Sequence, residues 1–370
     1  MMVPNMWKKR FGDDAAMAYA PGACGPSATW SEFGRPVSKP FGDQYVVVTE
    51  DRVICLGGQG HLHGYDLEGR RAYVCPPPES IRTLPQNIGP VVFGEVVVQV
   101  LMHGVAGYRA STGKMLWCVD VAAAAKALGR RLTGKALIYD SVSEAGVCVR
   151  AYGGVAFLIR PSDGALSVLG EHWPILKGVA GPFCTRVDAN DDHVLVRVAD
   201  PMPPLLRIGR SGAIMRALLS GNSYVLLDDN WLTACNVDTM TIAWQLPAYL
   251  GNPCECFGSL ACDGQVLYYR YAGAKRHTLV AINLADGSIL WQRLEMPGVG
   301  NPMNVHSLAV TGDRIVYLAG IRILLLDKQT GETLWTSEHM AELGTIMSGP
   351  CLAHGRAWVA VSGVGLRVIG

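Results

Sequence analysis

A short turn-and-tryptophan unit recurs along the chain, and this repeat constrains the fold more than any other feature. Residues 108–117, 282–291 and 326–335 share one frame, in which Trp follows a turn Gly by four positions. Weaker copies keep the frame without the full motif. The turn positions are 69, 113, 164, 212, 240, 287 and 331, so successive turns are 44, 51, 48, 28, 47 and 44 residues apart. A period of about 40–50 residues is typical of propellers and solenoids.

Each unit predicts the same local structure. Apolar runs rich in β-branched residues, such as residues 96–100 and 314–318, have the length of strands and are bounded by turn residues. In the turns, Asp and Thr can hydrogen-bond to their own backbone, and Gly accepts positive φ. One small sheet cannot bury both faces, so we predict antiparallel meanders that stack around a ring. The outer-strand residues expected to dock between neighbouring sheets are Trp117, Trp244, Trp291 and Trp335.

The repeat therefore predicts an all-β fold, a closed β-propeller of seven or eight blades of mostly four-stranded antiparallel sheets. After the last turn, residues 356–361 and 365–369 begin a further unit that lacks its outer strand, which residues 28–33 could supply. We expect residues 1–36 to form an N-terminal arm that closes the ring and residues 37–370 to form one propeller domain. The spacing of 28 residues between turns 212 and 240 is too short for four strands, so seven blades plus an irregular sheet is the alternative.

One segment predicts a helix. Residues 121–130 are rich in Ala, which favours helices, and Asp120 precedes them as a suitable N-cap. We place this helix as a short insert between blades.

The turn-and-tryptophan units resemble the docking motifs of pyrroloquinoline-quinone-type β-propeller repeats. That superfamily includes quinoprotein alcohol dehydrogenases and outer-membrane assembly propeller lipoproteins, and the resemblance covers roughly residues 45–370. The dehydrogenases carry adjacent cysteines beside the cofactor and a calcium held by Glu, Asn and Asp. This sequence has no adjacent cysteine pair and no motif that places calcium ligands. The resemblance is therefore to the non-catalytic branch, with no cofactor and no catalytic residue expected.

Composition excludes several classes of protein. Hydrophobic residues make up 49% and charged residues 17%, which excludes a disordered chain. The net charge is +1 without a basic stripe, so we expect no nucleic-acid partner. No apolar run is long enough to span a membrane. Lys8-Lys9-Arg10 is followed by Phe-Gly-Asp-Asp and not by an apolar core, so no signal peptide is recognisable. We expect a cytoplasmic location, or assembly from the cytoplasm into a virion.

The residues that could ligate a metal have simpler interpretations. There are eleven cysteines without a CxxC motif, several inside apolar runs, so we expect mostly free thiols in a reducing compartment. Cys254, Cys256 and Cys262 do not have the spacing of a structural zinc site. His61 and His63 follow a Gly-rich stretch and are expected in a polar turn. Residues 188–192 lack the Gly and closing Glu of a calcium loop and are expected to form a hairpin turn. No metal site is expected.

Pro-rich loops are the segments that the repeat does not require. Because rigid scaffolds often carry binding residues on loops, these loops are candidate protein interfaces. The candidate interface residues are Pro77, Pro203, Phe257 and Met303. The sequence thus favours a scaffold for protein–protein interaction within a larger assembly, in which the chain is one component or a homo-oligomer. The alternatives are a ring or nozzle component of a viral tail, and a quinone-dependent dehydrogenase or carbohydrate-active enzyme.

Overall fold

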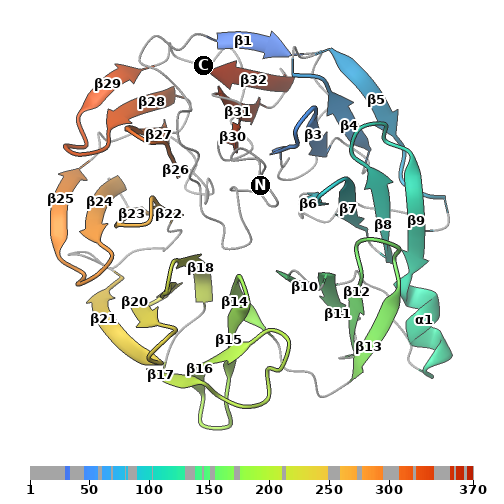
Figure 1. Ribbon diagram of the computed structural model, residues 1–370, viewed down its shortest axis with the longest axis horizontal. Coiled ribbons are helices and arrows are strands. Elements are labelled where there is room, and N and C mark those ends of the chain that lie inside the picture. The colour runs from blue at the N-terminus through green and yellow to red at the C-terminus, as the bar shows by residue number, and fades with distance from the viewer. Residues whose placement is uncertain are drawn as a thin grey trace.

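The computed structural model describes most of the strands and the connections nearest to them. The described residues are 30–33, 46–56, 61–67, 70–79, 81, 90–101, 103–129, 138–143, 146–150, 155–170, 176–210, 214–248, 259–272, 277–294, 308–319, 322–336, 351–353, 356–361 and 365–369. Within them, the strands form eight four-stranded sheets arranged as the blades of a ring (Figure 1). Neighbouring strands pair antiparallel in every blade, so the architecture is an eight-bladed β-propeller.

Four blades form the first half of the ring, numbered here in chain order. Blade 1 contains β2 (Val46–Val48), β3 (Val53–Leu56), β4 (Leu62–Tyr65) and β5 (Arg71–Cys75). Blade 2 contains β6 (Val91–Phe93), β7 (Val96–Val100), β8 (Gly104–Arg109) and β9 (Met115–Asp120). Blade 3 contains β10 (Ile138–Ser143), β11 (Gly146–Arg150), β12 (Ala156–Ile159) and β13 (Leu166–Gly170). Blade 4 contains β14 (Lys177–Ala180), β15 (Phe183–Val187), β16 (Asp192–Arg197) and β17 (Leu206–Arg210).

Four more blades complete the ring. Blade 5 contains β18 (Ile214–Ser220), β19 (Ser223–Asp228), β20 (Trp231–Asn236) and β21 (Thr241–Pro247). Blade 6 contains β22 (Ser259–Cys262), β23 (Val266–Ala272), β24 (His277–Asn283) and β25 (Ile289–Leu294). Blade 7 contains β26 (Leu308–Val310), β27 (Arg314–Ala319), β28 (Arg322–Asp327) and β29 (Thr333–Thr336). Blade 8 contains β30 (Cys351–Ala353), β31 (Arg356–Val361), β32 (Gly365–Ile369) and β1 (Trp30–Phe33).

Blade 8 is built from both ends of the described chain. β1 pairs antiparallel with β32, with Trp30 opposite Ile369 and Phe33 opposite Leu366. The strand expected from residues 28–33 therefore supplies the outer strand that the last unit lacks. This pairing covers the edge of β32, which would otherwise expose unpaired backbone groups.

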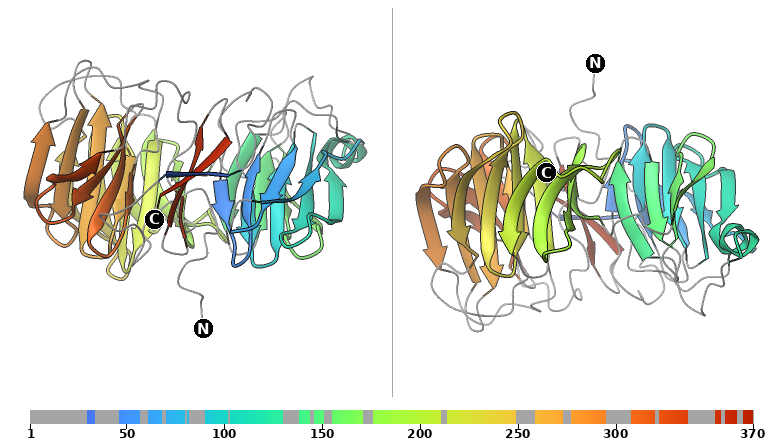
Figure 2. Two further views of the ribbon diagram at one scale, coloured as in Figure 1. Left: turned by 90° about the horizontal axis from the view of Figure 1, so that it is seen from above. Right: turned by 90° about the horizontal axis from the view of Figure 1, so that it is seen from below.

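The faces of the blades form the core. Both faces of an inner strand are buried because a blade lies on each side, and β2, β22 and β26 are accordingly buried at every position. One apolar cluster runs through blades 6, 7, 8 and 1, and a second runs through blades 4, 5 and 6. Smaller clusters join blade 2 to blade 3 and blade 1 to blade 2. Seen from the side, the described strands form a flat disc (Figure 2).

The helix lies where the sequence places it but is shorter. α1 spans Val121–Ala127, and the Asp120 side chain accepts a hydrogen bond of 2.8 Å from the Ala123 backbone N–H. Val121 and Ala125 are buried, so the helix packs its apolar side against the ring at the outer edge of blade 2. Among the described residues, no helix is long and apolar enough to cross a membrane.

One sequence interpretation was wrong, and it explains the uncertain blade count. The turn assigned to position 212 does not lie within a blade, because β17 and β18 on either side of it belong to different sheets. The connection between the third and fourth strands of blade 4 is instead residues 198–205. With the connection of blade 4 placed at residues 198–205, the interval from turn 164 to this connection and the interval from it to turn 240 each have the length of a full blade. The alternative of seven blades plus an irregular sheet is therefore excluded by the eight sheets.

Candidate functional site

The seams between blades are where the recurring residues meet. Three tryptophans on outer strands donate their indole N–H to a backbone carbonyl in the turn of the next blade. Trp117 donates to Pro161 O at 2.9 Å, Trp244 to Leu284 O at 2.8 Å, and Trp291 to Lys328 O at 3.3 Å. Tyr73 does the same from blade 1, since its hydroxyl donates to Ala110 O at 2.7 Å. We refer to this ring-to-turn contact as the latch.

A glycine lies under each latching ring. Gly287 has a φ of +76°, and a Cβ added there would lie 2.9 Å from the ring of Trp244. Gly164 and Gly331 also have positive φ. A Cβ added at Gly164 would lie about as close to the ring of Trp117, and one added at Gly331 about as close to the ring of Trp291. Glycine is therefore required at this turn position for two reasons. It adopts the left-handed backbone readily, and any side chain there would displace the ring. Trp244 is the most buried of these rings, with 7% of its surface exposed.

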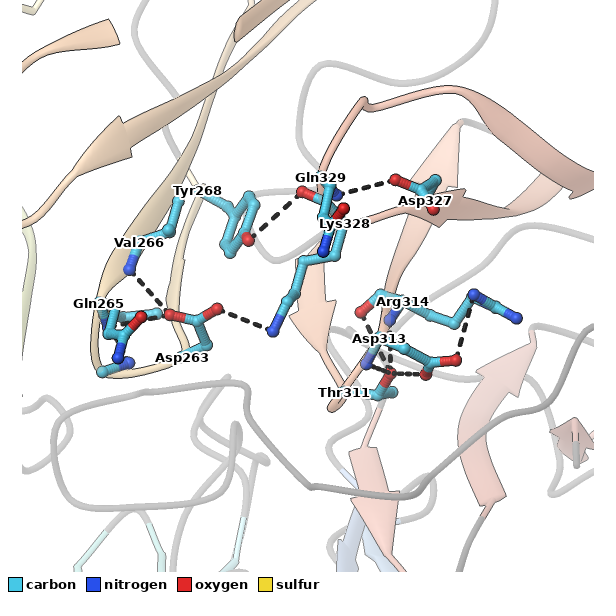
Figure 3. Close-up of polar contacts among 12 residues, drawn as sticks. Asp263, Gln265, Val266, Tyr268, Thr311, Asp313, Arg314, Asp327, Lys328 and Gln329 are labelled. Atoms are coloured by element: carbon cyan, nitrogen blue, oxygen red, sulfur yellow. Dashed lines mark hydrogen bonds and ion pairs between the residues drawn. The ribbon is translucent and has the colours of Figure 1, made fainter. Parts of the chain in front are cut away.

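A polar network strengthens the seam between blades 6 and 7 (Figure 3). Lys328 Nζ lies 2.9 Å from Asp263 Oδ2 across the seam, and the Tyr268 hydroxyl donates to Lys328 O at 3.5 Å. Burial acts to raise the pKa of Asp263. Hydrogen bonds from the Val266 and Gln265 backbone, together with Lys328, outweigh burial and hold that pKa below its usual value. The carboxylate is thus a fixed part of the seam.

Trp335 differs from the other three tryptophans expected to dock. It is half-buried against the cluster shared by blades 6 to 1. In blade 8, however, the third and fourth strands are β32 and β1, so no turn joins them. At the next seam, Leu67 O in the turn of blade 1 accepts a hydrogen bond of 2.9 Å from Arg356 Nη1 in blade 8. At this seam an arginine donates to the turn carbonyl of the next blade, whereas an aromatic side chain does so at the latched seams.

The seam between blades 3 and 4 has no latch among the described residues. In blade 2, Trp117 lies opposite Gly107, two residues before the turn. The corresponding residue of blade 3 is Leu158, and its partner is Ser167. Val168, the residue four positions after Gly164, lies opposite Phe157 instead and is exposed. Within the described ranges, no apolar cluster spans blades 3 and 4; the cluster on this side of blade 4 holds only its own residues.

Blade 4 replaces the tight turn with a longer Pro-rich connection. Arg186 Nε donates to Pro201 O and Arg186 Nη2 donates to Met202 O, both at 2.7 Å. Pro201 is buried, whereas Met202, Pro203 and Pro204 are exposed. At 62%, Met202 has the largest exposed fraction among the large apolar side chains described. The two hydrogen bonds from the Arg186 guanidinium thus hold an apolar loop exposed to solvent, and we refer to them as the Arg186 clamp.

The two candidate interface residues that the structure describes lie on different connections of the ring. Pro77 is half-buried and Pro203 is exposed, while Phe257 and Met303 lie outside the described residues. Pro77 follows the outer strand β5, on the connection from blade 1 to blade 2. Pro203 lies between the third and fourth strands of blade 4. In an antiparallel meander these two kinds of connection leave opposite ends of the sheet, so Pro77 and Pro203 lie on opposite faces of the ring. The sequence did not reveal the Arg186 clamp, because Arg186 is an ordinary strand residue in the pattern.

The residues considered for metal binding have structural contacts. Asp188 Oδ1 accepts the backbone N–H groups of Asn190 and Asp192, and Arg207 pairs with the carboxylates of Asp188 and Asp192 at 2.9 and 3.1 Å. Residues 188–192 are therefore a hairpin turn neutralised by Arg207. His63 is on strand β4 and buried, not in the polar turn expected, because the Gly-rich segment ends before the strand begins. Within the described ranges, no three His, Cys, Asp or Glu side chains are placed to hold a metal ion.

The described cysteines are thiols that take no part in disulfides. Cys55, Cys75, Cys148, Cys184, Cys235, Cys262 and Cys351 are buried and Cys118 is half-buried. Burial raises the pKa of Cys55 and Cys235 to about 12 and that of Cys75 to about 11. These thiols are protonated at neutral pH and behave as small core residues. Cys24, Cys254 and Cys256 lie outside the described residues.

Comparison with known proteins agrees with the fold. Residues 184–363 match the family model of the outer membrane protein assembly factor BamB. The structure of BamB from Moraxella catarrhalis is similar with a TM-score of 0.59 and 14% identity, covering 92% of this chain and 97% of that chain. No curated protein sequence matches this chain.

Two further structures show how widely the fold is shared. The quinohemoprotein alcohol dehydrogenase from Comamonas testosteroni has a TM-score of 0.62 and 10% identity, covering 100% of this chain and 80% of that chain. The computationally designed Ika8 protein has a TM-score of 0.64 and 13% identity, covering 91% of this chain and 99% of that chain. Together with the eight sheets, the structural matches show that the chain is a β-propeller, and the family-model match over residues 184–363 supports repeats of the pyrroloquinoline-quinone type.

Proposed function

We propose that this propeller is a non-catalytic scaffold that binds other proteins within a multi-protein assembly. The observation that carries the proposal is the match of residues 184–363 to the model of an assembly factor. The BamB structure agrees with this in fold alone, since the chain covers 97% of that protein at 14% identity. A scaffold uses the fold as a rigid support for exposed contact residues, and it needs no convergent catalytic groups.

The chemistry of the described residues fits this role. The carboxylates of Asp188, Asp192 and Asp263 are engaged with arginine, lysine or turn backbone. The buried thiols have raised pKa values and are poor nucleophiles. These groups stabilise blades and seams. The exposed apolar loop of blade 4 is a feature of the kind that protein contacts use.

The proposed partners are proteins that contact the faces of the ring. Nucleic acid is not proposed, because the chain carries a net charge of only +1. We also propose a compartment in which thiols remain reduced, because the eight described cysteines are thiols and not disulfides. That proposal follows from the chemistry of the thiols and does not depend on a particular partner.

A quinone-dependent dehydrogenase is the second candidate. It is favoured by the similarity of the whole chain to the alcohol dehydrogenase from Comamonas testosteroni, whose chain is covered to 80%. At 10% identity this similarity concerns the fold alone. The sequence also lacks the adjacent cysteine pair that the resemblance associates with the cofactor.

One experiment separates the two candidates. The chain is tagged, expressed at its native level and isolated with its bound proteins, which are then quantified. The scaffold predicts at least one protein in a fixed ratio to the chain. The same sample is incubated with pyrroloquinoline quinone and calcium and assayed with an alcohol and a dye acceptor. Turnover with bound quinone and no stoichiometric protein would establish the enzyme in place of the scaffold.

A further inference from the structure

The seam between blades 3 and 4 differs from the four latched seams in a way that leaves apolar groups uncovered. At four other seams an aromatic ring covers the turn of the next blade. Here Ser167 stands at the ring position, and residues 198–205 replace the tight turn. Within the described part of the chain, the Pro201 and Met202 carbonyls are contacted from inside blade 4 by Arg186, and by no side chain of blade 3.

The geometry of the loop shows that its exposure is imposed by specific contacts. Two hydrogen bonds of 2.7 Å join one guanidinium to two consecutive carbonyls, a geometry that fixes the loop backbone. Pro201 is buried and anchors the loop, and Pro203 has a restricted backbone. A loop ordered in this way loses little conformational entropy when a partner binds it.

One carboxylate stands beside the loop and faces solvent. Asp200 is exposed and directly precedes the first proline of the loop. The guanidinium groups on the neighbouring strands are directed elsewhere. Arg186 binds the loop carbonyls, Arg207 pairs with the two carboxylates of the hairpin turn, and Arg197 lies over the ring of Phe183, 5.5 Å from its centre. Asp200 is therefore the carboxylate next to the tip that a basic group of a partner can pair with.

The tip and its carboxylate together indicate the chemistry of the partner. Met202, Pro203 and Pro204 form an exposed apolar tip with Asp200 at its base. Methionine sulfur and proline rings both pack favourably on aromatic faces. A single carboxylate at the edge of an apolar contact is complementary to a single basic group placed beside the aromatic ring.

We propose that the clamped loop of blade 4 is a protein-docking surface whose partner presents an aromatic side chain next to a lysine or arginine. This inference rests on the proposed scaffold function and names the chemistry of one partner surface. The partner ring would contact Met202 and the two exposed prolines, and its basic group would face Asp200. A membrane surface is disfavoured as the occupant, because the tip offers one large apolar side chain and the adjacent carboxylate repels anionic lipid.

The Met202 methyl group gives a direct readout. The full chain is labelled with ¹³C at its methionine methyl groups, and the Met202 resonance is assigned by its loss in Met202→Leu. The chain is titrated with the acetylated, amidated dipeptide Trp-Lys. We expect an upfield ring-current shift of the Met202 resonance that saturates. The dipeptides Leu-Lys and Trp-Glu test the ring and the charge separately, and both should give smaller shifts. Equal shifts from Leu-Lys would overturn the proposal.

The variant Asp200→Asn tests the charged part of the surface. It removes the carboxylate and keeps the size and exposure of the side chain, so the fold should persist. We expect the variant to bind Trp-Lys and Trp-Glu with the same affinity, because the aromatic contact remains and the ion pair is gone. A variant that still prefers Trp-Lys as strongly as the parent does would contradict the assignment of Asp200.

Two further variants test the clamp. Arg186→Gln removes the fork and should weaken binding of Trp-Lys by about fivefold or more, because the loop is no longer held in place. Arg207→Gln is the matched control, since Arg186 and Arg207 both lie opposite Val194 on adjacent strands, whereas the described ion pairs of Arg207 are with Asp188 and Asp192. It should bind the peptide as the parent does. Unchanged binding by Arg186→Gln would contradict the proposal.

A double variant covers the case in which Arg186→Gln does not fold. Pro203→Ser with Pro204→Ser changes two exposed side chains and keeps the clamp, so the fold should persist while the peptide shift is lost. Vesicles of phosphatidylglycerol should leave the Met202 resonance unmoved; a larger shift with vesicles than with peptide would replace the protein partner by a lipid surface. A stoichiometric protein that still binds the double variant would leave the scaffold function standing and remove this surface alone.

Discussion

An indole ring at the edge of a blade joins two sheets by burial and by one hydrogen bond. Trp244 is the best case, since it is 7% exposed and donates to Leu284 O over Gly287. We expect Trp244→Ala to lower the free energy of unfolding by about 3–5 kcal/mol, as for other large aromatics removed from a core. Trp244→Phe keeps a ring and should cost less. Trp231→Ala is the control, because Trp231 is 38% exposed, and it should change little. Denaturant unfolding measures all three, and equal losses at positions 231 and 244 would refute the latch.

The buried imidazole of His63 predicts a pH dependence. Burial, with smaller effects from His61 and Arg71, lowers the pKa of His63 to about 4. The unfolded chain has the ordinary value of about 6.5, so it binds a proton that the folded state excludes. The stability contributed by neutral His63 is therefore full above pH 6.5 and is lost as the pH falls from 6.5 toward 4.

A variant isolates this contribution from that of the carboxylates. Between pH 7 and pH 4.5, His63→Gln should lose about 2–3 kcal/mol less stability than the parent chain. His61→Gln is the neighbouring control and should follow the parent. The measurement is the free energy of unfolding of each protein at the two pH values. An equal loss for His63→Gln and the parent would show that His63 is not buried as a neutral group.

At the scale of elements, blade 8 depends on a strand from the other end of the chain. β1 covers the edge of β32 through the four pairs from Trp30–Ile369 to Phe33–Leu366. Deleting residues 1–36 should lower the melting temperature and promote aggregation, because β32 then becomes an exposed edge. Deleting residues 1–27 is the control, because it removes the preceding residues but leaves β1 in place. It therefore separates the effect of losing β1 from the effect of losing those residues. A chain without β1 that melts like the full-length protein would show that this strand does not close the ring.

The elements also show which parts of the fold the sequence could predict. The turn Gly, the strand runs and the tryptophans predicted blades 2, 6 and 7, because local conformation and the seam contact depend on the same residues. Blade 4 has no tight turn of this kind and no aromatic ring latched onto it from blade 3 among the described residues, so its motif was sought at position 212, outside the blade. The clamp could not be predicted, because it joins Arg186 to carbonyls 15 and 16 residues away that any sequence could offer.

For the whole molecule, the state of the cysteines tests the proposed reducing compartment. All eight described cysteines are thiols outside disulfides, and seven of them are buried. We expect thiol titration of the denatured, unreduced protein to count close to the eleven cysteines of the chain. Native protein should react much more slowly, with Cys118 the most accessible of those described. A denatured count near one would mean five disulfides and an oxidising compartment.

If the intact ring is a scaffold, it is bound to other proteins in the cell. Native mass spectrometry of the chain isolated at its natural abundance tests this claim. The scaffold predicts a species heavier than the 39.7 kDa chain by the mass of one or more different proteins in fixed ratio. A species of 39.7 kDa, alone or increased only by the mass of a quinone, would contradict the claim and support an enzyme.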